Sequence, residues 1–184
     1  MKNPEWCRYT YLHRKAFEYC VRKLIRDPGL RDEMLRRARI HDMDKMIMYL
    51  FMDQKEAQKR HTETQPHHLE NDLPRTYYDL VETVIDYECA PYTKPDKPLN
   101  GYDFVLLLMK MKVLDEGTGN KLIDIMAELG IDHTGTVSKD KEGIEYIESF
   151  GEVSEEEILK EILCYVNGLP QSELRKLIGD KEMK

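Results

Sequence analysis

Residues 5–26, EWCRYTYLHRKAFEYCVRKLIR, decide the class of fold. Four apolar residues recur there at helical spacing, namely Leu12, Phe17, Cys20 and Leu24. Such spacing places them on one face of an amphipathic helix, while the charged residues between them face water. The stretch therefore predicts a long helix that buries one face.

Beyond this helix, prolines and glycines divide the chain into further helical segments. Leu, Met, Glu and Lys, which favour helices, are abundant, whereas no long alternation of Val, Ile and Thr predicts a strand. We therefore predict an all-α protein. Helices are expected at residues 30–52, 54–62, 74–89, 101–116, 121–129 and 154–166, with a short terminal helix after Gly168-Leu169-Pro170. The segment 101–116 is strongly apolar and is expected to form a core helix.

Caps and loops complete the predicted organisation. Ser154–Glu157 forms a capping box at the start of a helix. Pro91–Pro98 is expected to be a stiff loop, and residues 130–141 are loop-like. We expect an HD-like helical domain at 1–132, for the reasons given below, and a C-terminal helical extension at 133–184.

Composition and charge exclude some classes of function. Hydrophobic residues make up 41% and charged residues 34% of the 184 residues, which is typical of a globular protein that buries a core. The formal net charge of −7 argues against a broad face for an extended nucleic-acid duplex, because phosphate neutralisation needs concentrated positive charge. One basic stretch runs from Arg22 to Arg39. It is either the solvated face of a helix or a rim that attracts anions to a site.

The cysteines and the apolar runs bear on location. Four cysteines are scattered without a CxxC pair, which is typical of reduced thiols in a cytoplasmic protein: Cys7, Cys20, Cys89 and Cys164. Residues 1–6 lead directly into a charged helix and do not resemble a signal peptide. The longest apolar run, residues 104–109, is too short to cross a bilayer. We expect a cytoplasmic protein without a membrane partner.

The distribution of histidine is the strongest functional signal. Five of the six histidines fall within residues 13–68, and Asp42 follows His41 directly. Imidazole and carboxylate groups are the ligands that hold divalent Mn, Fe, Co, Ni or Zn. Adjacent ligands on one helix point about 100° apart, so His41 and Asp42 could reach two ions or share one through a bridging carboxylate. The sequence predicts a centre for one or two divalent transition-metal ions, with these candidate ligands: His13, His41, Asp42, His61, His67, His68 and Asp86.

Single members of this set carry little weight by themselves. Alone, His13 would more often be a surface or core histidine than a ligand, and Asp86 a cap or ion-pair partner. Their clustering favours metal binding over the alternative, a helical protein whose histidines gather by chance. His133 stands apart in a loop that contains glycine and threonine, and we exclude it from the site.

The order of these residues resembles the HD-domain metal-dependent phosphohydrolases. The superfamily's H…HD…D pattern is matched by His13, His41-Asp42 and Asp86, and His61 with His67-His68 extends it to the H…HD…H…HH…D order of two-metal members. Those members include the HD-GYP phosphodiesterases and the HD-type di-iron oxygenases. His41–Lys45 has the HDxxK form common there, and His13-Arg14 matches an early pair in an uncharacterised HD-like family of bacteria and phages. The resemblance covers residues 13–86.

Three departures narrow what the resemblance implies. Leu69–Pro74 stands where the GYP motif would follow the double histidine, which argues against cyclic dinucleotides as substrates. Tyr9 occupies the position of a glutamate that binds a third metal in some members, so we expect one or two ions. The spacing from Asp42 to Asp86 is shorter than in many HD enzymes, which implies a compact version of the helical core.

The resemblance implies an HD-like bundle that hydrolyses a phosphate ester, with a nucleotide as the favoured small substrate. Asp42 would bridge the metals, which stabilise charge on the phosphoryl oxygens. Lys45, three residues after Asp42, is expected on the same helical face. The cations Lys45 and Arg14 would contact the phosphate, although Lys45 could instead only pair with a carboxylate, Asp42 or Asp86. Glu70 is a candidate proton acceptor or support for a ligand.

Two other functions stay open on the same residues. A di-iron oxygenase of the HD type would use the same ligands, and the bound metal would decide the chemistry. A non-catalytic HD-like interaction or regulatory protein would keep the core for structure and use residues 133–184 to bind a partner. The sequence also leaves open whether the chain forms a homo-oligomer.

Overall fold

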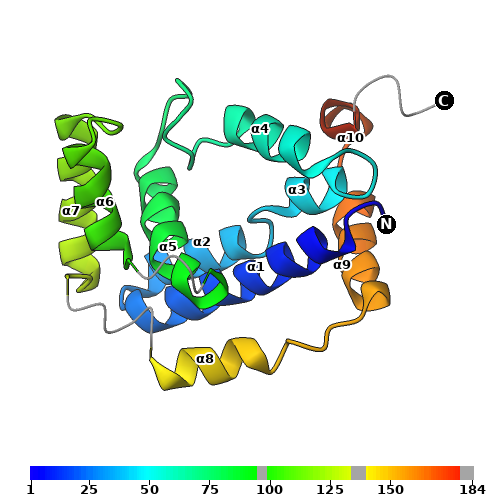
Figure 1. The fold of residues 1–184 in the computed structure, drawn as a ribbon, viewed down its shortest axis with the longest axis horizontal. Coiled ribbons are helices and arrows are strands. Elements are labelled where there is room, and N and C mark those ends of the chain that lie inside the picture. The colour runs from blue at the N-terminus through cyan, green and yellow to red at the C-terminus, as the bar shows by residue number, and fades with distance from the viewer. Residues whose placement is uncertain (95–98, 134–139, 179–184) are drawn as a thin grey trace.

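Helix α1 (Pro4–Leu24) is the longest helix of the computed structural model, and several other helices pack against it (Figure 1). The apolar face that the sequence predicts is buried, with Phe17 and Cys20 fully enclosed. Helix α5 (Tyr77–Thr93) packs along α1 and contributes Val81 and Ile85, which are also fully buried. Each such side chain stabilises the fold by about 1.5–3 kcal/mol. The α1–α5 pair therefore anchors the main core.

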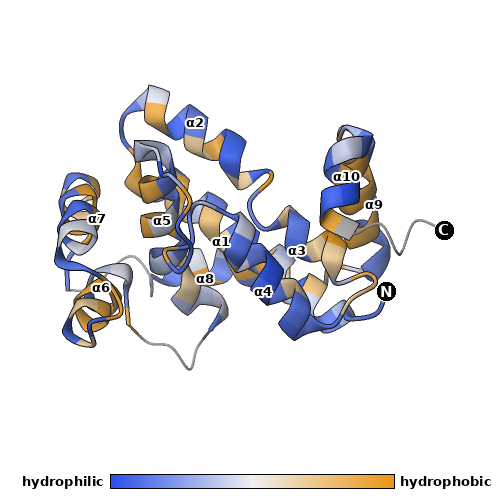
Figure 2. Ribbon diagram, turned by 90° about the horizontal axis from the view of Figure 1, so that it is seen from above, coloured by the Kyte–Doolittle hydropathy of each residue, from blue (hydrophilic) through white to orange (hydrophobic). Residues whose placement is uncertain are grey.

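The structure describes residues 1–94, 99–133 and 140–178. Every regular element within these ranges is a helix, which confirms the predicted all-α class. The other helices are α2 (Pro28–Ala38), α3 (Met43–Met48), α4 (Gln54–Thr64), α6 (Gly101–Lys110), α7 (Glu116–Leu129), α8 (Lys141–Glu148), α9 (Glu155–Asn167) and α10 (Gln171–Ile178). Figures 1 and 2 show α6 and α7 at one end of the molecule and α9 and α10 at the opposite end.

The two predicted loops lie partly outside the described residues. The expected stiff loop Pro91–Pro98 includes residues 95–98, and the expected loop 130–141 includes residues 134–139. Pro91 itself lies within the last turn of α5, so this helix begins after residue 74 and ends after residue 89, later than predicted at both ends. Residue 141 already belongs to α8, whose N-terminus is capped by the side chain of Asp140.

The connection between α2 and α3 departs from the prediction. The sequence predicts one helix over residues 30–52, whereas α2 ends at Ala38 and α3 begins at Met43. Asp42 adopts the left-handed conformation with φ 59°, which interrupts a right-handed helix. Aspartate enters this conformation more readily than most residues because its short polar side chain can bond locally. His41 and Asp42 therefore reach the site from a turn, and their prediction as neighbours on one helix is wrong.

The bounds of α6 and α7 also differ from the prediction. The helix expected over residues 101–116 ends at Lys110, and α7 begins at Glu116 instead of residue 121. The side chain of Asp115 accepts a hydrogen bond from the N–H of Thr118 and so caps α7. This cap starts a helix through a Gly-Thr-Gly segment whose composition predicts a turn.

Helix α6 is not the core helix that its apolar sequence predicts. It buries only Gly101 and Val105 completely. Leu106 and Leu107 keep 41% and 38% of their surface exposed. The apolar residues of α6 therefore face solvent or a cavity to an unusual extent.

The C-terminal helices complete a second core beside the α2–α3 turn. Ser154 and Glu157 form the predicted capping box at the start of α9. Ile158 and Ile162 of α9 are buried in one cluster with Met46 of α3. Helices α8 and α9 both pack on α1. The helices after residue 140 thus share buried surface with the N-terminal half.

The cysteines are free thiols, as the sequence predicts. Cys7, Cys20 and Cys89 are buried, and Cys164 is exposed. Among the described residues, no helix combines the length and the apolar character that crossing a bilayer requires.

Candidate metal centre

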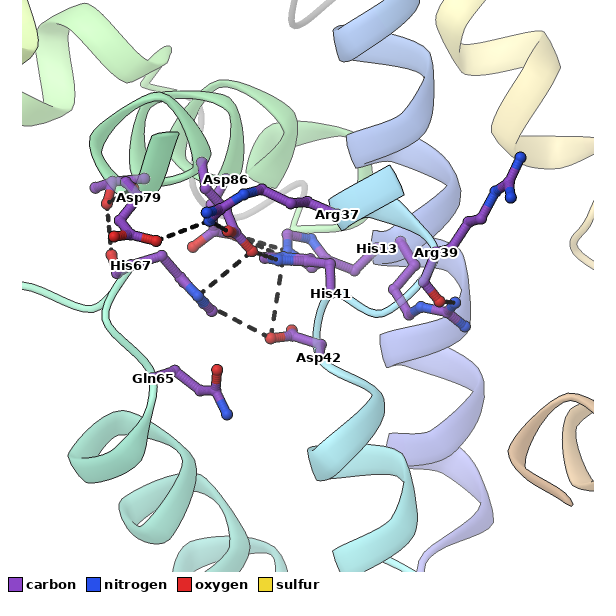
Figure 3. Close-up of polar contacts among 12 residues, drawn as sticks. His13, Arg37, Arg39, His41, Asp42, Gln65, His67, Asp79 and Asp86 are labelled. Carbon is purple, nitrogen blue, oxygen red and sulfur yellow. Dashed lines mark hydrogen bonds and ion pairs between the residues drawn. The ribbon is translucent and has the colours of Figure 1, made fainter. Parts of the chain in front are cut away.

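The predicted ligands come from separate parts of the chain and lie close together. Figure 3 labels five of them, His13, His41, Asp42, His67 and Asp86. The origins of the predicted ligands are His13 in α1, His41 and Asp42 in the α2–α3 turn, His61 in α4, His67 and His68 in the α4–α5 connection, and Asp86 in α5. The side chains of His41 and His61 are completely buried, and that of Asp42 is 3% exposed. The side chain of Asp86 keeps 18% exposure and is the most accessible of these ligands.

Four groups of described side chains lie close enough together to hold a metal ion, and two of them consist only of predicted ligands. The other two groups add a residue outside the predicted set, Cys89 beside His13 and Asp86, and Glu82 beside His41 and His67. In the His61 set, one ligand atom each from Asp42, His61, His67 and His68 lies within 4.8 Å of the others. In the His13 set, the same holds for His13, His41 and Asp42. Asp86 borders the His13 set, with Oδ1 at 2.7 Å from Nε2 of His13 and 3.7 Å from Nε2 of His41. Asp42 belongs to both sets, so its carboxylate stands where a ligand bridging two cations would stand.

Five buried ligand atoms form no hydrogen bond. They are Nε2 of His41, His61, His67 and His68, and Oδ1 of Asp42. Nε2 of His61 lies 3.0 Å from Oδ1 of Asp42, but these atoms are not aligned as a hydrogen bond requires. Each buried polar atom without a partner costs about 1–3 kcal/mol. These atoms fall within the two sets that share Asp42, where bound cations would satisfy them once His41 has released its proton, so the residues fit divalent metals.

Carboxylates hold the opposite ring nitrogens. Nδ1 of His41 lies 2.9 Å from Oε1 of Glu82, and Nδ1 of His61 lies 2.8 Å from Oδ2 of Asp44. A carboxylate that accepts a hydrogen bond from Nδ1–H fixes the tautomer in which Nε2 carries the free lone pair. Carboxylate–histidine pairs of this kind orient metal ligands in proteins. The arrangement therefore presents His41 and His61 to a metal through Nε2.

The charges of the cluster favour a bound cation. Burial opposes the charge on Asp42, but Lys45 and His41 outweigh it and hold the pKa of this carboxyl well below its usual range. Burial also opposes a proton on His41, yet the surrounding carboxylates, Asp42 foremost, raise its pKa to about 10. Burial, with the charge on His41, lowers the pKa of His67 to about 3. The Asp42 carboxylate and the neutral His67 ring are ready to bind a metal, whereas His41 must release its proton first.

Lys45 lies beside the cluster, as the sequence predicts. Its Nζ donates to Oδ2 of Asp42 at 2.8 Å, and its side chain is only 12% exposed. Oδ2 is thereby occupied, whereas Oδ1 of the same carboxylate belongs to the ligand sets. Lys45 therefore compensates the charge of Asp42 from the side of Oδ2, and the Asp42 carboxylate separates it from the other ligand atoms.

The structure does not bring Arg14 together with the ligands as a phosphate contact. Its guanidinium donates to Oε1 of Glu161 at 2.9 Å and to the backbone carbonyl of Arg39 at 2.5 Å. Arg14 therefore ties α1 to α9 and to the α2–α3 turn. Glu70 is mostly exposed and lies 3.7 Å from Nδ1 of His68, which lowers the pKa of its carboxyl.

Sequence reasoning missed several residues around the ligands. Glu82 and Asp44 were not expected to support histidines, although Glu82 lies one helical turn before Asp86. Arg37, from the basic stretch, donates to Glu82 at 2.8 Å and so holds this carboxylate in place. Lys94 lines a cavity beside Asp86 at the end of α5, two turns after that ligand.

His133 lies apart from the cluster, as expected. It is exposed, and its ring centroid is 6.3 Å from that of Tyr102.

Two cavities open onto the ligands from different sides. One of about 590 Å³ is bordered by His68, Glu70, Asp86 and Lys94. The other, about 310 Å³, is bordered by residues of the α2–α3 turn and by His67. A larger hollow of about 730 Å³ lies between the α1–α2 turn, α5 and α7, and no candidate ligand borders it. Two of these cavities are therefore bordered by candidate ligands.

No protein-family model, curated protein or solved structure matches this chain. The described residues show an all-helical protein with buried histidine, aspartate and glutamate groups that could hold a metal ion. The HD-domain resemblance stays a prediction from the order of the ligands.

Proposed function

We propose that this chain is a metal-dependent phosphohydrolase whose centre holds two divalent ions. The observation that carries the proposal is the group of five buried ligand atoms without hydrogen bonds, arranged in two sets that share Asp42. Several histidines with one bridging carboxylate match the ligand preferences of Mn, Fe, Co, Ni and Zn. The same residues follow the H…HD…H…HH…D order along the chain.

The ions would supply an activated water and positive charge for the phosphoryl oxygens. The chain's own residues assist in other ways. Asp42, the carboxylate common to both sets, would help to hold both ions, and Lys45 balances the charge of this carboxylate. Lys94 carries a positive charge to the cavity that Asp86 borders, where it can bind a phosphate oxygen. Glu70 borders the same cavity and can accept a proton.

The substrate in this proposal is a small phosphate ester. The cavity of about 590 Å³ is of the size that holds a mononucleotide or a similar molecule. The resemblance favours a nucleotide. The substrate's phosphate would lie at the Asp86 end of the cavity, where the ligands and Lys94 meet.

The experiment that tests the function begins with metal content. Purified protein is analysed for bound metals, loaded with Mn, Co, Ni or Fe, and assayed on a panel of phosphate esters that includes nucleotides. We expect two ions per chain and release of phosphate. Oxygen consumption by the iron-loaded protein without phosphate release would instead assign the HD-type oxygenase. Tightly folded protein that binds no metal and turns over no ester would refute the enzyme and favour an interaction protein.

A Lys45→Ala variant tests the nearby cation. If Lys45 contacts the phosphate, as the sequence predicts, the variant should keep its metal and its activation free energy should rise by about 2–4 kcal/mol, the effect of removing one preorganised charge contact in a transition state. If Lys45 only neutralises Asp42, the variant loses stability and keeps its kcat. Metal content, melting temperature and kcat measured on the same sample separate these results, and unchanged turnover would discard the catalytic role.

A further inference from the structure

The cavity beside Asp86 has walls of two kinds. The polar residues that border it come from α4, the α4–α5 connection, and α5 with the residue that follows it, namely Gln58, His68, Glu70, Asp86 and Lys94. Leu69, Tyr87 and Ala90 line the cavity from the same elements, and a second wall is formed by α6 and the turn that follows it. Every lining residue from that wall is apolar, namely Phe104, Leu107, Leu108, Val113 and Leu114. The cavity therefore joins a charged region at the metal ligands to a hydrocarbon surface.

The apolar wall exposes hydrophobic side chains to water, which is unfavourable in free energy. Leu107 and Val113 keep 38% and 64% of their surface exposed, and Leu99 on the same cavity keeps 40%. Removing apolar surface from water is worth about 25 cal/mol per Å². Figure 2 shows hydrophobic residues along α6, at the end of the molecule away from α9 and α10. An apolar group that covers this wall would gain the burial that the fold itself leaves unused.

We infer that the centre acts on phosphate esters of apolar alcohols, with the alkyl part of the substrate lying against α6. This inference rests on the proposed function and narrows its substrate class. The phosphate would lie by Asp86 and Lys94, and the hydrocarbon chain would extend towards Leu107 and Val113. A nucleobase fits this wall less well, because its edge carries donors and acceptors. The side chains of α6 and the following turn that line the cavity offer them no partner, and burying them unpaired is unfavourable.

Alkyl phosphates of increasing length test the inference. Wild-type protein loaded with Mn is assayed on ethyl, butyl, hexyl and octyl phosphate, with nucleoside monophosphates in parallel. We expect kcat/KM to rise about two- to fourfold per added methylene until the wall is covered, because each buried methylene is worth up to about 0.8 kcal/mol. A flat series, or a preference for the nucleotides, would overturn the inference while leaving the phosphohydrolase in place.

Two neighbouring leucines provide a matched pair of variants. Leu107 and Leu106 are consecutive on α6 and similarly exposed, but only Leu107 lines the cavity. Leu107→Asn should flatten the dependence on chain length at unchanged metal content, whereas Leu106→Asn should preserve it. Equal behaviour of the two variants would count against the apolar wall.

Binding separates failure of the inference from failure of the proposed function. Alkylphosphonates of the same lengths cannot lose their phosphorus group by ester hydrolysis, and their affinity is measured by calorimetry on the metal-loaded protein. Affinity that rises with chain length supports the apolar wall even if no ester is turned over, a result that would sink only the hydrolase. Affinity independent of chain length overturns the inference whatever the enzyme assays show.

Discussion

Asp44 offers a selective way to weaken half of the candidate metal centre. Both its carboxylate oxygens lie within 2.9 Å of Nδ1 of His61, and Nε2 of Gln65 donates to Oδ2 at 2.9 Å. Asp44→Asn keeps the size of the side chain but removes its charge. The hydrogen bond that fixes the His61 ring then joins neutral groups, and the ring becomes a weaker ligand through Nε2.

The expected loss can be worked out from this contact. A hydrogen bond to a charged group contributes about 1.5–3 kcal/mol, against about 0.5–1.5 kcal/mol for a neutral one. The difference, about 1–1.5 kcal/mol, corresponds to a loss in metal affinity of about tenfold. Partners of metal-bound histidines change affinity by about 10- to 100-fold when they are replaced. We therefore expect Asp44→Asn to weaken the His61 set at least tenfold and to leave the His13 set almost unchanged.

The assay titrates chelator-treated protein with Co²⁺ and follows both binding steps by calorimetry and visible absorption. Glu82→Gln is the comparison variant, because Glu82 accepts from Nδ1 of His41 in the His13 set at 2.9 Å and lies farther, 3.5 Å, from Nδ1 of His67 in the His61 set. Asp44→Asn should weaken mainly the step that fills the His61 set, and Glu82→Gln mainly the step that fills the His13 set. Circular dichroism checks that both remain folded. Two unchanged binding constants in folded Asp44→Asn, or equal losses in both steps with both variants, would refute the division into two sets.

Further variants and the pH dependence test the remaining assignments. Asp42→Gly, which suits the left-handed backbone, should remove most bound metal because both sets share this carboxylate, whereas His133→Ala should not; equal metal content in the two proteins would reject the site. Arg14→Ala should lower stability by about 2 kcal/mol, since it breaks a buried ion pair with a partly exposed partner, and should leave metal content unchanged in elemental analysis. Metal affinity should fall as the pH is lowered from 10, because the metal displaces the proton of His41; a profile that is flat from pH 8 to 5 would contradict this. Chelator-treated protein should melt at a lower temperature as the pH rises from 7 to 10. The folded-state pKa of His41, about 10, lies above the ordinary histidine pKa of 6.5, so the stabilisation that is fully present below pH 6.5 is lost as the pH rises to 10.

Some of the centre could be predicted from the sequence because ligand chemistry is restrictive. Few residue types bind transition metals, so the order of His13, the HD pair and the later histidines is informative without a structure. The carboxylates that hold these ligands in place could not be predicted in the same way. Carboxylates such as Glu82 are common on helix surfaces, and only the packing of α5 against the α2–α3 turn brings this one to Nδ1 of His41.

In the fold, too, features that depend on local sequence could be predicted, whereas features that depend on tertiary packing could not. The long amphipathic α1 and the cap at Ser154 follow from local patterns, and the structure confirms both. The break at Asp42 does not, because a single left-handed residue leaves no trace in hydrophobic periodicity. Nor could apolar composition distinguish a core helix from α6, whose leucines are partly exposed or line a cavity. The consequence is that the apolar cavity wall was unforeseen.

The left-handed backbone at Asp42 restricts which amino acids can evolve at that position. Its φ of 59° is tolerated by glycine, asparagine and aspartate but is unfavourable for most other side chains. A shared metal ligand there requires an anionic oxygen on a short side chain. Glycine and asparagine tolerate the left-handed backbone but carry no charge. Glutamate carries the charge, but its longer side chain does not suit this backbone. In a library of all substitutions at residue 42, only a small group of variants should therefore fold. Within that group, only the protein with aspartate should bind its full amount of metal.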